Sequence, residues 1–290
     1  MSNAKTLFGN SLADTPNVAP CKSKDDTESI LPEKYDWREA FPECVQNVTS
    51  QGNCSASYAT AAISVVQDRI CTQTKQPIQL SAQEIISCDK GNYGCEGGYA
   101  TRALGWGKRK GFIPESCYPY TGTKGECIAE DHLNSNECRL NNQLYKVIDF
   151  CLASEEQGIK REILKNGPVI AQMVVYTDFL TFSSGVYHRT ENAFKFNGQQ
   201  IVKIIGWDRQ GDGNEFWLIE NSWGPDWGEN GVARILASDK STQLDFFALG
   251  VAVYPYTMAE YYAQQEEMQK KSTTTTTAET EEVIDIDAAT

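Results

Sequence analysis

Ten cysteines constrain the fold of this 290-residue chain more than any other feature, because all of them lie in its first 151 residues. An even and crowded set of this kind indicates disulfide bridges that form in an oxidising compartment. Zinc binding by Cys88, Cys95, Cys117, Cys127 and Cys138 is the alternative, but the ligands of structural zinc sites are usually separated by roughly two to four residues. That spacing is absent, and we therefore predict disulfides and no metal site.

The charge of the chain restricts its partners. A formal net charge of −13 at pH 7 repels both nucleic acids and anionic membrane surfaces, so neither is expected to bind. The sequence has no run of about 18 apolar residues, the length needed to span a membrane. The cysteines favour an extracellular, secretory or endolysosomal location. The first residues lack the apolar core of a signal peptide, which leaves an intracellular assembly open.

Composition divides the chain into three segments. Residues 1–30 are polar and lack apolar periodicity, and we interpret them as a leader or the remnant of a propeptide. Residues 31–256 are the expected globular body. Residues 257–290 form an acidic, Thr-rich tail that is expected to be disordered, because it cannot bury enough apolar surface to fold alone. Within it, residues 258–271 could form a short polar helix.

The body divides near residue 140 into a helical half and a β half. Apolar residues recur at helical spacing in residues 55–68 and 100–110, and Ser81 with Glu84 has the pattern of a helix N-cap. Apolar runs between glycines predict strands at residues 169–176, 202–207, 215–221 and 231–236. The sequence therefore predicts an α+β fold of two lobes with a cleft between them, residues 31–140 being mainly helical and 141–256 mainly β.

Several short motifs resemble those of one enzyme family. Residues 51–58 (QGNCSASY) carry the frame of a catalytic motif, in which Cys54, Ala56 and Tyr58 match and Ser57 stands at the reactive position. Further matches follow in order: DWRE at 36–39, GCEGGY at 94–99, CYPY at 117–120, NGP at 166–168, SGVY at 184–187, GW at 206–207 and ENSWG at 220–224. On these motifs the chain resembles the papain family over about residues 31–256. Residues 68–71 (DRIC), the early Cys44 and residues 206–208 (GWD) make it most similar to cathepsin B.

This resemblance implies both a fold and a set of disulfides. The fold is a papain-like pair of lobes, with a helical left lobe, a β-barrel-like right lobe and a cleft between them. The implied bridges are Cys44–Cys71, Cys54–Cys95, Cys88–Cys127 and Cys117–Cys138. Two cysteines remain, and we expect Cys21 to pair with Cys151, which would tie the leader to the body although the family has no such bridge.

The resemblance also assigns the catalytic positions. Ser57 stands at the position of the family's nucleophilic cysteine, and Gln200, six residues before Gly206, stands at that of its catalytic histidine. Gln51 matches the family's oxyanion-hole amide, and Asn221 matches the amide that orients the histidine. Gly97 and Gly98 match the strand that pairs with a peptide backbone. A hydroxyl nucleophile needs a base to accept its proton, and a glutamine amide has no basic nitrogen. We therefore expect no active catalytic residue and no cofactor.

Other roles stay open for some of these residues. The two histidines, His132 and His188, are out of register with the base position, and His188 is expected at the surface or a strand end. Gln51 and Gly98 could serve either peptide binding or the scaffold, whereas Asn221 is expected to pack the interface between the lobes together with Trp223.

The sequence thus favours an inactive peptidase homologue that acts as a binding or structural protein. Its partner would be a protein or peptide, including its own leader, since residues 5–20 are expected in or near the cleft that contains Ser57. The alternatives are a hydrolase that uses Ser57 with an unrecognised base, and a laboratory knockout of an active protease.

Overall fold

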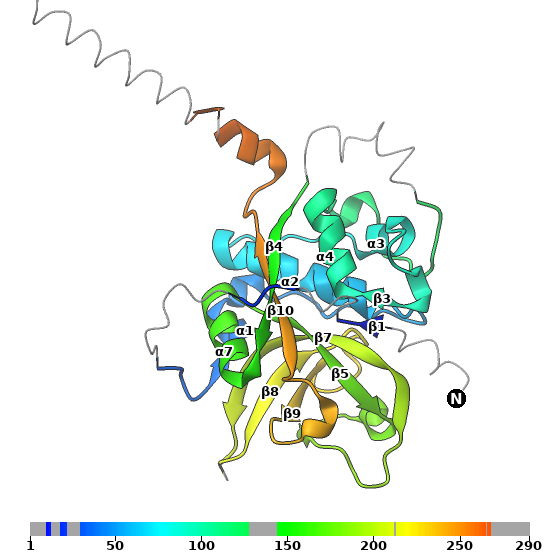
Figure 1. The fold of residues 1–290 in the computed structure, drawn as a ribbon, viewed down its shortest axis with the longest axis vertical. Coiled ribbons are helices and arrows are strands. Elements are labelled where there is room, and N and C mark those ends of the chain that lie inside the picture. Colours follow the sequence, from blue (N-terminus) through cyan, green and yellow to red (C-terminus); the bar gives the residue numbers. More distant parts are fainter. Residues whose placement is uncertain are drawn as a thin grey trace, which may run out of the picture.

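Helices and strands separate into two halves, as Figure 1 shows. The computed structural model describes residues 10–12, 18–21, 30–127, 144–211, 213–264 and 266–267. Helices α2 (Ser57–Thr74), α3 (Ala82–Cys88) and α4 (Ala100–Arg109) form one lobe, and a large sheet forms most of the other. The predicted α+β fold with two lobes is therefore confirmed.

Helix α2 lies at the centre of the molecule. It packs against α3 and α4 on one side and against strands of the sheet on the other, so its side chains are buried almost all round. The sequence predicted its start within two residues but ended it at residue 68, six residues early. The helix ends at Lys75, whose left-handed backbone, with φ of 61°, lets its N–H donate to the carbonyl of Cys71.

Local sequence signals account for the other helices of this lobe. The hydroxyl of Ser81 accepts a hydrogen bond from the N–H of Glu84 at 3.1 Å, which confirms the predicted N-cap of α3. Helix α4 has Lys108 and Arg109 in its last turn, where cations stabilise the helix dipole. Shorter elements are α1 (Trp37–Ala40) and the 3-10 turns at Pro42–Cys44, Gly94–Glu96, Glu115–Cys117, Thr177–Thr181 and Lys240–Thr242.

The sheet has the strand order β4-β10-β5-β7-β8-β9-β6, in which every neighbouring pair is antiparallel except β6 and β9. Three two-residue strands lie off this path: β1 (Asn10–Ser11) pairs with β3 (Gly98–Tyr99) and with β7, and β2 (Tyr35–Asp36) pairs with β7. The main strands are β4 (Val147–Ser154), β5 (Val169–Tyr176), β6 (Val186–Tyr187), β7 (Lys195–Arg209), β8 (Glu215–Glu220), β9 (Val232–Leu236) and β10 (Phe247–Val253).

The second half of the chain contains a helix and further strands besides the strands predicted from the sequence. Strands β5, β7, β8 and β9 were predicted, although β7 begins seven residues before the expected residue 202. Strands β4 and β10 and helix α7 (Glu155–Asn166) were not predicted. Only two apolar side chains of α7 are buried, Ile159 and Ile163, one turn apart, and this is too little periodicity to indicate a helix.

Four disulfides have the predicted pairing. They are Cys21–Cys151, Cys44–Cys71, Cys54–Cys95 and Cys88–Cys127. The predicted bridge Cys117–Cys138 lies outside the described residues at Cys138. Because cysteines 88, 95 and 127 are used in these bridges, the described part of the chain does not support the zinc alternative.

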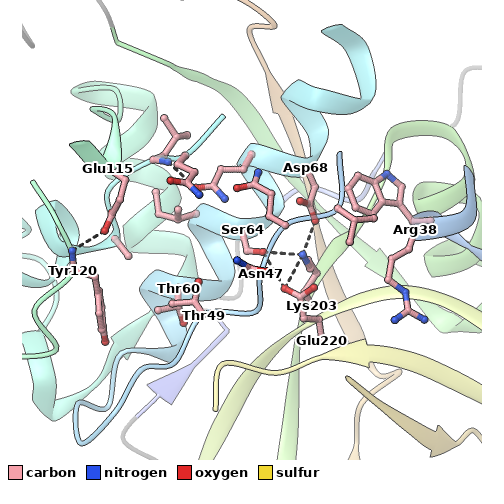
Figure 2. A pocket seen from close by; sticks show the side chains of 18 residues that line it. Arg38, Asn47, Thr49, Thr60, Ser64, Asp68, Glu115, Tyr120, Lys203 and Glu220 are labelled. Carbon is pink, nitrogen blue, oxygen red and sulfur yellow. Dashed lines mark hydrogen bonds and ion pairs between the residues drawn. The ribbon is translucent and has the colours of Figure 1, made fainter. Parts of the chain in front are cut away.

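A buried ion-pair group joins the two lobes (Figure 2). Lys203 of β7 lies between Asp68 of α2 and Glu220 of β8, with Nζ at 2.6 Å and 2.9 Å from their carboxylate oxygens, and it also donates to Ser64. Burial raises the pKa of Asp68 to about 6, against the opposing effect of Lys203. These side chains line a polar cavity of about 230 Å³ at the lobe interface.

The chain beyond β10 continues into a helix over residues 258–264, where a helix was expected in the tail. Its first turn is capped by Thr257, whose hydroxyl accepts from the N–H of Glu260 at 3.2 Å. Among the described residues, no helix combines the length and the apolar character that crossing a bilayer requires.

Candidate functional site

The N-terminus of α2 meets the middle of β7 where the sequence placed the nucleophile and the base. Ser57 is the first residue of α2 and Gln200 lies on β7, and neither side chain is exposed to solvent. The hydroxyl oxygen of Ser57 accepts a hydrogen bond from the backbone N–H of Ile201 at 3.1 Å. The structure thus brings together the two predicted positions, and the hydroxyl faces a backbone donor.

The side-chain nitrogen of Gln200 points to three acceptors. It lies 3.0 Å from Gln51 Oε1, 2.9 Å from Asn221 Oδ1 and 3.3 Å from Ser222 Oγ. Asn221 therefore does more than pack the lobe interface, since its oxygen orients the amide of Gln200. Ser222 is a further member of this group that the sequence did not identify, because a serine beside a matched asparagine carries no signal of its own.

Two polar atoms of this group have no hydrogen-bond partner among the described residues, namely Gln200 Oε1 and Asn221 Nδ2, although both are buried. A void of about 20 Å³ adjoins Asn221, and Ser222 and Thr49 are among its other lining residues. A space of this size holds one water molecule. A water there would satisfy the Asn221 amide, which otherwise would cost about 1–3 kcal/mol of stability.

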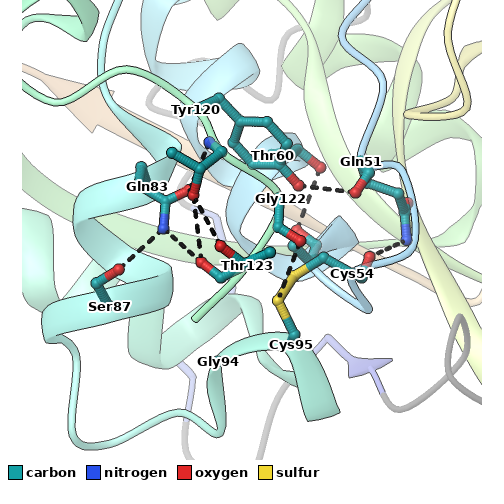
Figure 3. The surroundings of a disulfide bond; sticks show 12 residues. Gln51, Cys54, Thr60, Gln83, Ser87, Gly94, Cys95, Tyr120, Gly122 and Thr123 are labelled. Carbon is teal, nitrogen blue, oxygen red and sulfur yellow. Dashed lines mark hydrogen bonds between the residues drawn. A yellow bond between two sulfur atoms is a disulfide. The ribbon is translucent and has the colours of Figure 1, made fainter. Parts of the chain in front are cut away.

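Gln51 is fixed at both ends of its side chain, and Figure 3 shows its hydrogen bonds with Cys54 and Tyr120. Its Nε2 donates to the carbonyl of Cys54 at 2.9 Å, and its Oε1 accepts from Gln200 and, at 2.5 Å, from the hydroxyl of Ser222. The hydroxyl of Tyr120 donates to the backbone carbonyl of Gln51 at 2.9 Å. The amide that would serve as oxyanion donor is thus part of a closed hydrogen-bond network.

The glycine strand beside the site has no room for a side chain. A Cβ atom on Gly98 would lie 2.4 Å from Asn92 Oδ1 and 2.9 Å from Tyr58 Cε2. Gly97 has a φ of 111°, in the range that favours glycine. The N–H of Tyr99 donates to Asn92 Oδ1 at 2.7 Å, which fixes the path of β3. Tight packing therefore explains Gly98 and the positive φ explains Gly97, and the outer side of β3 is available for strand pairing.

That side is occupied by the N-terminal segment of the same chain. Strand β1 pairs in parallel with β3, Asn10 with Gly98, and its other side pairs with Gln199 of β7 in antiparallel orientation. Figure 1 shows β1 between β3 and β7. The leader thus lies next to the residue that precedes Gln200. Of the range 5–20 expected near the cleft, residues 5–9 and 13–17 lie outside the described residues.

Leu12 anchors this segment. Its side chain is only 6% exposed and belongs to the apolar core around α2. Its N–H donates to Gln172 Oε1 at 2.6 Å, and its carbonyl accepts from the N–H of Thr101 at 3.1 Å. Gln172, on β5, also accepts from the hydroxyl of Ser11 at 3.1 Å. The sequence did not single out Gln172, because its position mid-strand gives no hint of a partner 160 residues away.

No imidazole among the described residues lies at this site. His188 is exposed just after β6, as expected, and His132 lies outside the described residues. The neighbouring Tyr58 donates to the carbonyl of Gly94, and burial raises its pKa well above the usual value, so it stays protonated at neutral pH. The described surroundings of Ser57 therefore offer hydrogen-bond donors and amides, and no group that would accept a proton at neutral pH.

Within the described part of the chain, one group of side chains has potential metal ligands within reach of one another, namely Cys21, Cys151 and Glu162. Both sulfurs are joined in a disulfide, and metal binding by cysteine requires the thiolate. In this oxidised form the group is a covalent link and offers only a carboxylate.

Comparison with known proteins agrees with this geometry. The family described as "Papain family cysteine protease" matches residues 31–249. Cathepsin B-like CP3 of Giardia intestinalis is 33% identical over 211 residues, which cover 71% of this chain and 69% of that protein. Tubulointerstitial nephritis antigen-like of Rattus norvegicus is 31% identical over 256 residues, 77% of this chain and 55% of that protein.

Among solved structures, proCathepsin B S9 from Trypanosoma congolense superimposes with a TM-score of 0.79 at 28% identity, covering 88% of both chains. The mite allergen structure described for Blo t 1 and Der p 1 has a TM-score of 0.70 at 24% identity and covers 87% of this chain and 82% of that one, which shows the shared fold.

Proposed function

Since this chain belongs to the papain family of cysteine proteases and has a cathepsin B-like fold, we propose that it is a member that does not cleave peptides and acts as a binding or structural protein. One observation carries this proposal: at the base position, Gln200 directs an N–H donor, and no basic nitrogen, toward the site.

The chemistry of hydrolysis requires a nucleophile that loses its proton and a group that accepts it. Ser57 has a hydroxyl in place of a thiol, and the carboxamide of Gln200 has no basic atom that could take the proton. In a comparable triad, loss of the nucleophile or the base lowers turnover on the order of 10⁶-fold. The two replacements together support inactivity more strongly than either would alone.

Occupation of the cleft supports a binding role. Residues 10–12 already use both β3 and β7 as strand partners and fill an apolar site with Leu12. An extended segment paired with these strands supports a protein or peptide as the partner class. The four disulfides support a secretory or lysosomal location for this role.

The proposal is tested by measuring hydrolysis of fluorogenic dipeptide and tripeptide substrates between pH 4 and 8 with the full chain. Turnover is expected to equal that of the matched variant Ser57→Ala at every pH. Turnover that disappears in Ser57→Ala would overturn the proposal and establish Ser57 as a nucleophile. Contaminating proteases are distinguished because they would act equally in both preparations.

A further inference from the structure

The N-terminal segment contacts the body at a second place, on strand β4, in addition to its pairing with β3 and β7. Residues 19–21 run beside β4, the edge strand of the sheet, where the N–H of Leu152 donates to the carbonyl of Ala19 at 2.8 Å. The N–H of Cys21 donates to the carbonyl of Leu152 at 3.0 Å, and Pro20 forms a parallel bridge with Leu152. The segment thus forms a one-residue bridge to β4 at one end and pairs with β3 and β7 at the other.

A disulfide fixes this second place covalently. Cys21 is joined to Cys151 of β4 across 130 residues of sequence. Cleavage of the chain anywhere between residues 21 and 30 would therefore leave residues 1–21 attached to the body. An attached segment has a high local concentration, on the order of millimolar, and competes with any free peptide for the cleft.

This bridge is also more accessible than the other described ones. Both Cys21 and Cys151 are partly exposed, whereas each of the other three described bridges has at least one buried cysteine. A pocket with a volume of about 560 Å³ lies against it, lined by Cys21, Cys151, Glu162 and Lys165 among others. A small thiol therefore has access to the Cys21–Cys151 sulfurs first.

We propose that the Cys21–Cys151 disulfide keeps the N-terminal segment in the cleft after the chain is cut between residues 21 and 30, and that its reduction opens the cleft to other peptides. The reductant is a dithiol or two monothiols. One thiolate attacks a protein sulfur and breaks the bond, a second releases the mixed disulfide, and two electrons and two protons pass to the protein, which gains two thiols while the reductant becomes a disulfide.

The experiment uses the full chain with residues 22–29 replaced by the recognition sequence of a site-specific protease. The matched control carries the same sequence with Cys21→Ser and Cys151→Ser. Both proteins are cut and passed through a size-exclusion column, and their masses are then measured under non-reducing conditions. Hydrogen exchange is then measured at the N–H groups of Thr101 and Leu152, which donate directly to Leu12 and Ala19 of the segment.

The cut, oxidised protein is expected to keep residues 1–21 and to exchange at Thr101 and Leu152 as slowly as the uncut protein. The cut double variant is expected to lose the segment and to exchange at least tenfold faster at both amides. A labelled peptide with the sequence of residues 8–14 should bind only the form that lacks the segment. If the double variant folds poorly, the cut protein with both cysteines retained and only this bridge reduced, verified by mass, takes its place.

Two results would overturn the inference: loss of the segment from the cut, oxidised protein, or slow exchange with retained segment in the cut form that lacks the bridge. The inference rests on the proposed function only in treating the cleft as a peptide site. Peptidase turnover would contradict the proposed function and leave the exchange result unchanged, so the two failures are distinguishable.

Discussion

The side-chain nitrogen of Gln200 donates a hydrogen bond to Oδ1 of Asn221 at 2.9 Å, so that the asparagine aligned with the family's orienting amide holds a second amide in place. Asn221 Oδ1 also accepts from the N–H of Ser222 at 2.8 Å. The side-chain nitrogen of Gln200 therefore has its acceptors without an imidazole, whereas Gln200 Oε1 and Asn221 Nδ2 have no hydrogen-bond partner among the described residues.

Replacing Gln200 by alanine should destabilise the protein by about 2–4 kcal/mol, because it creates a cavity and leaves the buried oxygens of Gln51 and Asn221 with fewer donors. The free energy of unfolding is measured in denaturant with the disulfides intact. Gln199→Ala is the matched control, since Gln199 is partly exposed and pairs with Asn10 through the backbone. Equal losses in the two variants would contradict a structural role for the Gln200 amide.

Restoring both catalytic groups should restore a reactive thiol. In Ser57→Cys with Gln200→His, a thiolate at the start of α2 would be stabilised by the imidazolium and the helix dipole, so alkylation by iodoacetamide should persist down to about pH 5. In Ser57→Cys alone, the rate should fall below about pH 8 as an ordinary thiol protonates. The segment is removed from both variants before labelling, and identical pH profiles would show that the two positions do not interact.

Glu215 should contribute stability that depends on pH. Hydrogen bonds from the guanidinium of Arg209, 2.6 Å away, and from other neighbours lower its pKa to about 2. A lowered carboxyl pKa stabilises the fold above the unfolded value of 4.5, and this stability is lost as the pH falls toward 2. Because the side chain is 27% exposed, Glu215→Gln should cost only about 1–2 kcal/mol at pH 7.

The cost of Glu215→Gln should shrink toward zero between pH 4.5 and 2, as measured by thermal unfolding across that range. Glu191→Gln, at an exposed position, serves as the control and should show little change at any pH. A cost for Glu215→Gln that stays constant with pH would mean that the ion pairs contribute nothing and that the loss arises from packing.

Two glycine substitutions should have opposite signs. Gly98→Ala forces a Cβ against Asn92 and Tyr58, and should destabilise the fold by about 1–3 kcal/mol and displace the N-terminal segment. Gly158 lies inside α7, and a Cβ atom there would meet open space, so Gly158→Ala should stabilise the fold by about 0.5–1 kcal/mol. Thermal unfolding measures both, and a neutral Gly98→Ala would show that β3 shifts without cost.

The sequence predicted best where a motif fixes both spacing and chemistry. The capping pair Ser81 and Glu84 marked the start of α3. The family motifs placed Ser57 close to Gln200 although these residues are 143 positions apart in the sequence (200 − 57). Three of the four described disulfides followed from the same resemblance. The Cys21–Cys151 pair followed by elimination, since these cysteines were the two left over.

What the sequence did not predict depends on contacts between distant residues. Gln172 binds Leu12 only because the leader returns to the sheet, and no local pattern around either residue indicates this. Helix α7 was not predicted because only two of its apolar side chains are buried. An ion pair between distant residues also positions it, with a guanidinium nitrogen of Arg69 2.8 Å from a carboxylate oxygen of Glu162. Ser222 joined the site through its hydroxyl, which a motif match at Asn221 does not reveal.

The contact of residues 19–21 with β4 has a consequence for a shortened form of the protein. A chain that starts at residue 31 loses Cys21, which leaves Cys151 as an odd thiol, and it uncovers the backbone groups of Leu152 on an open sheet edge. Two such chains could meet edge to edge with their Cys151 thiols nearby and oxidise to a covalent dimer. We therefore expect covalent dimers in the shortened chain, which the Cys21–Cys151 bridge of the full chain would prevent.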